Sequence, residues 1–208
     1  MSVFSDFAID RKLGIRSGGV REWLEDVPEY NRFEATPYRA LDDLFLHYRP
    51  GKGAHLVDFG CGLGRVIFYF HYRFKTRGTG IELNDETFPD LLLNLERYKE
   101  TRGTDDVPIE FIQEPAETVA LPEDSNIFFF FNPFSFRIFE KVMENIIHSL
   151  ADNPRTAYII LYYPLESYRS IIRSWRSFTL VDEIPLDWGV DKYDRFLIYR
   201  YDPETAAE

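Results

Sequence analysis

Residues 56–65 read LVDFGCGLGR, and this stretch decides the fold. Its apolar first half is typical of a short buried strand, and the glycines that follow at alternate positions are typical of a tight turn. These glycines are Gly60, Gly62 and Gly64. Glycine permits positive φ angles and lets the backbone come within van der Waals distance of a ligand. Because a helix begins where the turn ends, its free N–H groups face the crevice at the carboxyl end of the strand, and we expect a ligand site there.

The same alternation of apolar strands and amphipathic helices continues along the chain. Strands are expected at 54–59, 78–83, 108–112, 127–131 and 158–163. Helices are expected at 37–48, 64–74, 86–101, 135–150 and 165–175. The last two apolar runs, 177–184 and 195–201, are typical of an antiparallel pair. This order predicts an α/β protein with a doubly wound, Rossmann-like sheet that is mainly parallel and ends in an antiparallel hairpin.

The chain ahead of this pattern carries weaker signals. Residues 1–35 are polar, aromatic and irregular. The first helix is expected to begin at Pro37, with Thr36 as its N-cap. We expect residues 1–50 to form an N-terminal helical extension packed on the core, and residues 51–208 to form the main domain as a single structural unit.

Composition and charge exclude several classes of function. The chain has 208 residues, and its 35 acidic against 24 basic side chains give a formal net charge of −11. Such a charge argues against tight, non-specific binding to a phosphate backbone, which requires a positive field. No apolar run reaches the length of a membrane span, and the N-terminus lacks the apolar core of a signal peptide. We therefore expect a soluble, cytoplasmic protein.

Cysteine and histidine usage bears on metals and disulfides. The single cysteine, Cys61, excludes an internal disulfide and a cysteine-rich zinc site. The four histidines lie far apart in the sequence, without the close spacing that metal ligands on one helix require. We therefore expect no metal site.

Two acidic residues flank the glycine turn and select the kind of cofactor. Glu82 ends the second strand at the spacing of an acid that accepts both hydroxyls of a ribose. Asp58 lies two residues before the first glycine, where it would repel a pyrophosphate but attract an ammonium group. The dinucleotide pattern also fits poorly, because Arg65 stands where its third glycine is required. A ligand with a ribose at one end and a cationic amino acid at the other, such as S-adenosylmethionine, satisfies both carboxylates.

The motifs DFGCGLGR (58–65) and GIELN (80–84) resemble motifs I and II of the class I S-adenosylmethionine-dependent methyltransferases. The resemblance covers about residues 54–201 and implies the seven-strand fold of that family. It implies that the glycine loop approaches the methionine part of the cofactor, that Asp58 holds its amino group and that Glu82 holds the ribose hydroxyls. The cofactor-binding residues implied in this way are Asp58, Phe59, Gly60, Cys61, Gly62, Gly64, Glu82, Leu83, Ala116, Glu117, Asn132 and Pro133.

The adenine end of the site departs from the family pattern. Members often carry Asp after the third strand to accept from the adenine amino group, whereas this chain has Pro115 there. We expect the Ala116 N–H and Glu117 to contact adenine instead. In the segment ahead of the first helix, Tyr30 and Tyr38 are candidates for a lid over the cofactor.

The fourth strand runs into Asn132-Pro133-Phe134. This run is similar to the Asn-Pro-Pro-Tyr/Phe motif of methyltransferases that act on planar amides or exocyclic amines, although it has one proline where that motif has two. The similarity implies that Asn132 and a backbone carbonyl accept hydrogen bonds from the target amine, and that Phe134 stacks on the substrate. The segment 30–38 is also similar to the lead-in of lysine methyltransferase-like proteins, through Thr36-Pro37.

These observations predict a methyltransferase that uses S-adenosylmethionine and acts on a protein side chain such as Lys or on a small metabolite. Two alternatives stay open: a nucleic-acid base N-methyltransferase and a non-catalytic module that binds S-adenosylmethionine. An NAD-dependent oxidoreductase is disfavoured by the glycine pattern. The methyl acceptor is a partner that the sequence does not identify.

Overall fold

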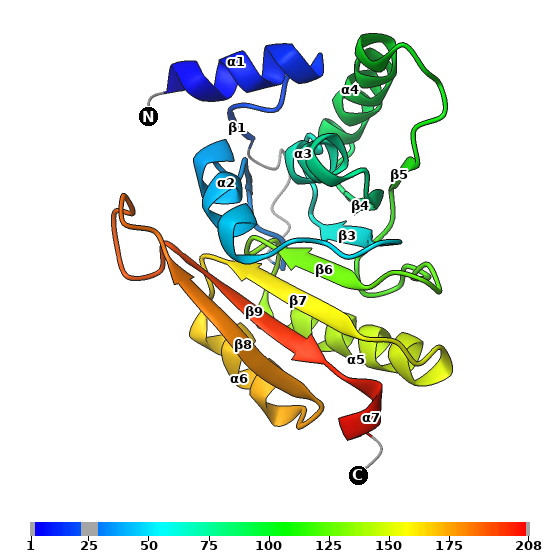
Figure 1. Cartoon of the computed structure of the whole chain (residues 1–208), viewed down its shortest axis with the longest axis vertical. Coiled ribbons are helices and arrows are strands. Elements are labelled where there is room, and N and C mark those ends of the chain that lie inside the picture. The colour runs from blue at the N-terminus through cyan, green and yellow to red at the C-terminus, as the bar shows by residue number, and fades with distance from the viewer. Residues whose placement is uncertain (1–2, 22–28, 207–208) are drawn as a thin grey trace.

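The computed structural model describes residues 3–21 and 29–206. Its centre is a seven-stranded sheet in the order β5-β4-β3-β6-β7-β9-β8 (Figure 1). The strands are β3 (His55–Phe59), β4 (Arg77–Ile81), β5 (Ile109–Ile112), β6 (Ile127–Phe130), β7 (Ala157–Tyr162), β8 (Phe178–Pro185) and β9 (Arg195–Tyr201). The pairs from β5 to β7 are parallel, and β9 is antiparallel to both β7 and β8. The predicted doubly wound, mainly parallel sheet with a C-terminal antiparallel hairpin is therefore confirmed.

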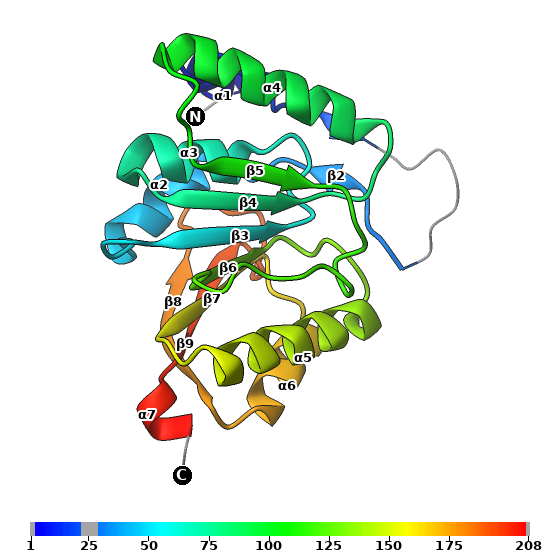
Figure 2. The same cartoon turned by 90° about the vertical axis from the view of Figure 1, so that its right-hand side faces the viewer.

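Helices cover both faces of this sheet. They are α1 (Val3–Leu13), α2 (Tyr38–His47), α3 (Arg65–Phe74), α4 (Thr87–Arg102), α5 (Phe136–Asp152), α6 (Glu166–Ser174) and α7 (Pro203–Ala206). Figure 2 shows α1 and α4 on one side of the sheet and α5 and α6 on the other. One apolar core lies beneath α2, α3 and α4, and a second lies beneath α5 and α6. Within the described part of the chain, no helix combines the length and apolar character needed to cross a membrane.

The connections follow from local sequence. Ser135 caps α5, since its side chain accepts a hydrogen bond from the Ile138 N–H. Asn84 accepts from two backbone N–H groups at the start of α4, as expected for a capping side chain. The apolar strand β6 is fully buried between its neighbours, as the unbroken run of phenylalanines predicts.

In the N-terminal region, the structure differs from two of the expectations drawn from the sequence. Residues predicted to be irregular form α1 and a short antiparallel pair, β1 (Val20–Arg21) with β2 (Phe33–Glu34). Polar contacts help to hold α1: Asp10 accepts hydrogen bonds from nearby Ser17 and from the hydroxyl of Tyr38, which is 28 residues away. Such contacts leave no periodic apolar pattern in the sequence. The prediction that Thr36 is the N-cap of the next helix is also wrong.

Helix α2 begins at Tyr38, and its N-cap is Pro37, which has no side chain able to accept a hydrogen bond. Thr36 instead turns its carbonyl oxygen toward Arg65, which donates a hydrogen bond of 3.1 Å to it. The chain therefore enters α2 through a tertiary contact rather than through a local cap.

Arg65, the first residue of α3, joins the N-terminal region to the main sheet. Its guanidinium is only 5% exposed and donates to the Ser17 hydroxyl at 2.8 Å and to the Asp6 carboxylate at 2.7 Å. It also lies over the Tyr38 ring, 4.5 Å from the ring centroid. Arg65, which does not fit the dinucleotide pattern, thus connects α3 to the N-terminal region through its side chain.

We predict that Arg65→Met lowers the free energy of unfolding by about 2–4 kcal/mol, because it leaves buried polar groups without their donor. Urea denaturation measures the loss. The matched control is Arg73→Met on the same helix, whose ion pair with Asp42 is exposed on both sides and is worth less than about 1 kcal/mol. Equal losses for the two variants would contradict the role given to Arg65.

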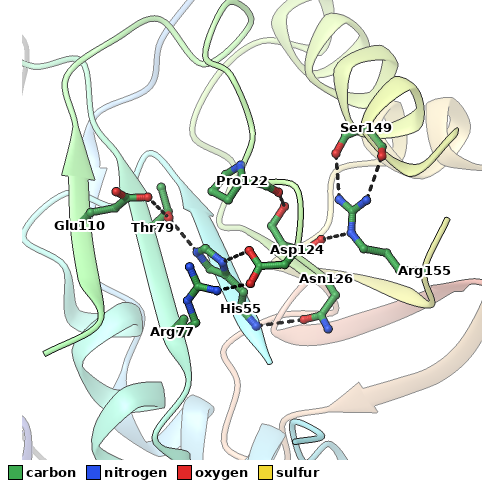
Figure 3. Close-up of polar contacts among 10 residues, drawn as sticks. His55, Arg77, Thr79, Glu110, Pro122, Asp124, Asn126, Ser149 and Arg155 are labelled. Carbon is green, nitrogen blue, oxygen red and sulfur yellow. Dashed lines mark hydrogen bonds and ion pairs between the residues drawn. The ribbon is translucent and has the colours of Figure 1, made fainter. Parts of the chain in front are cut away.

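A second polar network lies at the amino-terminal edge of the sheet, away from the glycine turn (Figure 3). The buried His55 ring contacts Asp124 through Nδ1 and the Thr79 hydroxyl through Nε2, each at 2.9 Å. Thr79 in turn donates to Glu110 at 2.8 Å, and Arg77 pairs with Asp124. The acid–His–hydroxyl order resembles a catalytic triad, but Thr79 is fully buried, and the network joins strands β3, β4 and β5 instead.

Candidate functional site

A pocket lies at the carboxyl ends of β3, β4 and β6, where the strand order reverses direction around β3. This is the place where doubly wound sheets bind ligands. Site residues predicted from sequence that line the pocket are Asp58, Gly60, Cys61, Glu82, Leu83, Ala116, Pro133 and Phe134. The remaining cavity has a volume of about 50 Å³, because the segment ahead of α2 fills much of the pocket.

The glycine turn has the predicted left-handed conformation. Gly60, Gly62 and Gly64 have φ angles of 69°, 53° and 83°. A side chain at Gly64 would clash with Phe68 and Leu91 in the core, so this glycine is required for packing of α3 and α4. A side chain at Gly62 would instead clash with the ring of Phe33, which lies on the outer face of the turn. Of the three glycines, only the exposed Gly60 lines the pocket, so the approach predicted for a ligand is at Gly60, while Gly62 and Gly64 are buried outside the pocket lining.

Glu82 fixes the turn against the end of β4. One carboxylate oxygen accepts from the Gly62 N–H at 2.9 Å, and the other accepts from the Asn84 N–H at 2.8 Å. Burial raises the pKa of Glu82, while hydrogen bonds from the backbone N–H groups of Asn84, Gly62 and Leu83 act in the opposite direction. Each oxygen keeps acceptor capacity beyond these bonds, because a carboxylate offers about four lone-pair sites.

Asp58 faces the same pocket without such compensation. It lies in β3 opposite Gly80 of β4 and Phe129 of β6, and it is only 4% exposed. None of the residues that the structure describes gives this carboxyl a hydrogen bond or an ion pair, and burial together with the charge of Glu82 raises its pKa well above the ordinary value. A buried carboxyl with no donor is costly, and a cation that enters the pocket would remove that cost.

Cys61 lines the pocket but is not an activated nucleophile. Burial raises the pKa of its thiol, and the nearby carboxyl groups of Asp58 and Glu82 raise it further. A reactive cysteine requires the opposite environment, in which a cation or a helix N-terminus stabilises the thiolate.

Several predicted residues lie outside this pocket. Phe59 is 1% exposed and stacks on Phe130 in the second core, with 4.8 Å between the ring centroids, so it has no surface to offer a ligand. Alternation along β3 explains the difference, because successive side chains point to opposite faces of the sheet. Glu117 lies at the rim and accepts from the Tyr30 hydroxyl at 2.7 Å. Asn132 lies in a neighbouring cavity.

Of the residues that cover the site, sequence reasoning named only Tyr30 and missed the others. Tyr30, Asn31 and Phe33 all line the pocket, together with Arg65 from the start of α3. Of the two tyrosines proposed as a lid, Tyr30 does lie over the pocket, whereas Tyr38 is buried beneath Arg65 and donates to Asp10. The only sequence signal was the aromatic character of the segment, which does not specify its partners.

The neighbouring cavity has a volume of about 740 Å³ and lies beside the ends of β6 and β7. Three aromatic rings line it: Phe131, Tyr162 and Tyr163. Among the described residues, its charged lining consists of the acids Glu34, Asp191 and Asp194 and the cation Arg32. This second cavity is therefore aromatic and acidic. Among the residues described, no group of three or more His, Cys, Asp or Glu side chains is arranged to hold a metal ion.

Comparison with known proteins places this geometry in context. No family profile matches the sequence, and no curated protein does. Solved structures do match. The chain has the fold of the class I methyltransferases.

A human methyltransferase 10 domain-containing protein aligns over 96% of this chain and 94% of its own, with a TM-score of 0.58 and 14% identity. PH1948 of Pyrococcus horikoshii, provisionally named an RNA methyltransferase, aligns over 97% and 98%, with a TM-score of 0.58 and 15% identity. The glycopeptide N-methyltransferase MtfA aligns over 80% and 90%, with a TM-score of 0.55 and 12% identity. These structural alignments establish the methyltransferase fold, and the low sequence identities leave the methyl acceptor open.

We predict that Asp58→Asn stabilises the ligand-free protein, by about 1–3 kcal/mol at neutral pH, because it removes a buried charge that has no donor. The pKa of Asp58 is raised in the folded protein. The wild-type protein therefore has its full stability below the pKa of the unfolded chain, near 3.9, and loses stability as the pH rises toward the pKa of the folded state. The gain should therefore be absent in acid, below the unfolded pKa, and grow as the pH rises toward the raised pKa of the folded protein.

Thermal unfolding between pH 4 and pH 8 measures this gain. The control is Asp152→Asn, an exposed acid at the end of α5, which should leave the melting temperature nearly unchanged at every pH. A destabilised Asp58→Asn protein would mean that the carboxyl has a structural donor.

Proposed function

We propose that the protein is a methyltransferase that binds S-adenosylmethionine in the pocket at the glycine turn and transfers its methyl group to an amine-bearing acceptor. The observation that carries the proposal is the buried carboxyl of Asp58, which lies next to Glu82 and receives no hydrogen bond or ion pair from the part of the chain that the structure describes. An ammonium group satisfies the first and ribose hydroxyls satisfy the second, and S-adenosylmethionine has both.

Each residue has a defined task in this proposal. Asp58 holds the amino group of the cofactor, and burial strengthens that ion pair by lowering the local dielectric constant. Glu82 accepts from the ribose hydroxyls while the Gly62 and Asn84 amides keep its carboxylate in place. Leu83 and Ala116 flank the site expected for adenine. When bound, the cofactor supplies an electrophilic methyl group on a sulfonium, so the protein must mainly position the acceptor and exclude water.

The second cavity supports an amine-bearing acceptor. Its acids would attract a cation and its three aromatic rings offer faces on which an ammonium group can lie. Asn132 donates its side-chain NH2 to the Tyr163 carbonyl at 2.7 Å, which leaves its oxygen to accept an N–H of the substrate. A protein side chain such as Lys and a small amine metabolite both fit, and the similarity of segment 30–38 to lysine methyltransferase-like proteins agrees with the first.

A nucleic-acid base is the second candidate acceptor. The Asn132-Pro133-Phe134 run favours it, and so does the full-length structural likeness to PH1948. The acidic lining of the second cavity and the net charge of −11 oppose it, because both repel a phosphate backbone. A non-catalytic cofactor-binding module would keep the first pocket and fail to turn over any acceptor.

Isothermal titration with S-adenosylhomocysteine and with NAD tests the cofactor assignment. We expect binding of the first and none of the second. Glu82→Gln should weaken binding by about tenfold or more, because it removes a charged acceptor from the ribose. Glu96→Gln, an exposed acid on α4, is the control. Binding of NAD alone would refute the assignment.

Transfer of a radiolabelled methyl group from S-adenosylmethionine tests the acceptor class. We expect label in a lysine-rich peptide or in spermidine, and none in total transfer RNA. Tyr163→Ala should lower kcat/KM about tenfold by removing one aromatic wall of the second cavity. Label in RNA alone would replace the amine proposal with the nucleic-acid one.

A further inference from the structure

The segment Glu29–Glu34, which we call the strap, crosses the mouth of the candidate cofactor pocket. It lies against the chain that follows β6, where Tyr30 and Phe134 form an antiparallel bridge. At the far end of the strap, Phe33 and Glu34 form β2. The strap therefore has a defined backbone position over the site.

At one end of the pocket, the strap occupies the groups expected to bind adenine. The Tyr30 hydroxyl accepts from the Ala116 N–H at 3.3 Å and donates to Glu117 at 2.7 Å. These are the two groups assigned to adenine from the sequence. The Tyr30 ring packs edge-on against Phe134, with 5.9 Å between the centroids.

In the middle of the pocket, the ring of Phe33 covers the glycine turn. A Cβ atom built on Gly62 would lie 2.0 Å from this ring, so the aromatic face rests directly on the backbone. Phe33 also lines the pocket itself, together with Gly60 and Cys61, the residues of the turn that face the candidate ligand site. The methionine part of the cofactor and the Phe33 ring cannot share that surface.

Near the second cavity, Asn31 occupies carbonyl groups at the end of β6. Its backbone N–H donates to the Pro133 carbonyl at 2.9 Å, and its side-chain NH2 donates to the Asn132 carbonyl at 2.7 Å. A backbone carbonyl in this run is the expected acceptor for the target amine. The carboxamide of Asn31 thus takes hydrogen bonds that a substrate amine would require.

We propose that the strap is an intramolecular competitor of the cofactor, which fills the adenine, methionine and target-amine positions of the ligand-free protein and must leave before S-adenosylmethionine binds. This inference rests on the proposed function. The cavity of about 50 Å³ that the strap leaves is suited to a few water molecules. A ligand of nucleoside size requires a cavity of roughly 300 Å³ or more.

The energetic consequence is a lowered apparent affinity. If only a fraction of molecules has the strap displaced, the measured Kd equals the intrinsic Kd divided by that fraction. Contacts that hold the strap therefore act against the cofactor. Weakening them should tighten binding, which is the reverse of the effect expected for a lid that closes over a bound ligand.

Hydrogen exchange of the wild-type protein, with and without saturating S-adenosylhomocysteine, tests the competitor directly. We expect peptides spanning 29–36 to be protected in the free protein and to exchange faster once the ligand is added, while peptides spanning 60–65 become slower. Slower exchange of 29–36 on ligand addition would identify a closing lid and overturn the proposal. Fast exchange of 29–36 in the free protein would also overturn it.

Titration calorimetry of the double variant Asn31→Ala/Phe33→Ala supplies the second measurement. We expect its Kd for S-adenosylhomocysteine to be about tenfold or more lower than that of the wild type. The matched control is Phe7→Ala, an exposed phenylalanine on α1, which should bind within about twofold of the wild type.

The outcomes separate the two proposals. Equal or weaker binding by the double variant, with binding to the wild type intact, overturns the competitor and leaves the proposed function standing. Absence of heat and of any protection at 60–65 in both proteins removes the cofactor assignment, and the competitor falls with it.

Discussion

Two carboxyl groups buried side by side at the ends of adjacent parallel strands are the constraint on which the site depends. Burial raises the pKa of both Asp58 and Glu82, and the charge of Glu82 raises the pKa of Asp58 further. Two backbone amides, from Gly62 and Asn84, offset part of the cost of burying the charge of Glu82. Asp58 recovers none of its own cost from the residues that the structure describes. Natural proteins keep such violations mainly where function requires them, so the unsatisfied carboxyl distinguishes a ligand site from a structural turn.

A single buried side chain, Arg65, links the pocket to the N-terminal region. Arg65 begins the helix that follows the glycine turn, and it binds Asp6 and Ser17 as well as the carbonyl of Thr36 just beyond the strap. One guanidinium therefore fixes the start of α3, the region of α1 and the far end of the strap. Displacement of the strap would therefore break the bridge between Tyr30 and Phe134 and leave Thr36, which Arg65 holds, in place.

Much of the fold could be predicted because its signals are local. The apolar strands, the amphipathic helices and the glycine turn each carry their pattern within a few residues, and Glu82 follows from its spacing. Helix α1 and the strap could not be predicted, because polar contacts across long sequence separations hold them, such as Asp10 with Tyr38 and Tyr30 with Glu117. The core position of the Phe59 side chain could not be predicted, because family motifs mark a loop and do not state which face of β3 a side chain occupies.

The central claim is that the buried Asp58 carboxyl binds the ammonium group of the cofactor. Its pKa, measured by carboxyl carbon NMR with and without S-adenosylhomocysteine, tests that claim most directly. We predict a pKa well above the ordinary value in the free protein and a clear fall on binding, because the ammonium group of the ligand stabilises the carboxylate. A normal pKa in the free protein, or one that the bound ligand leaves unchanged, would contradict the account.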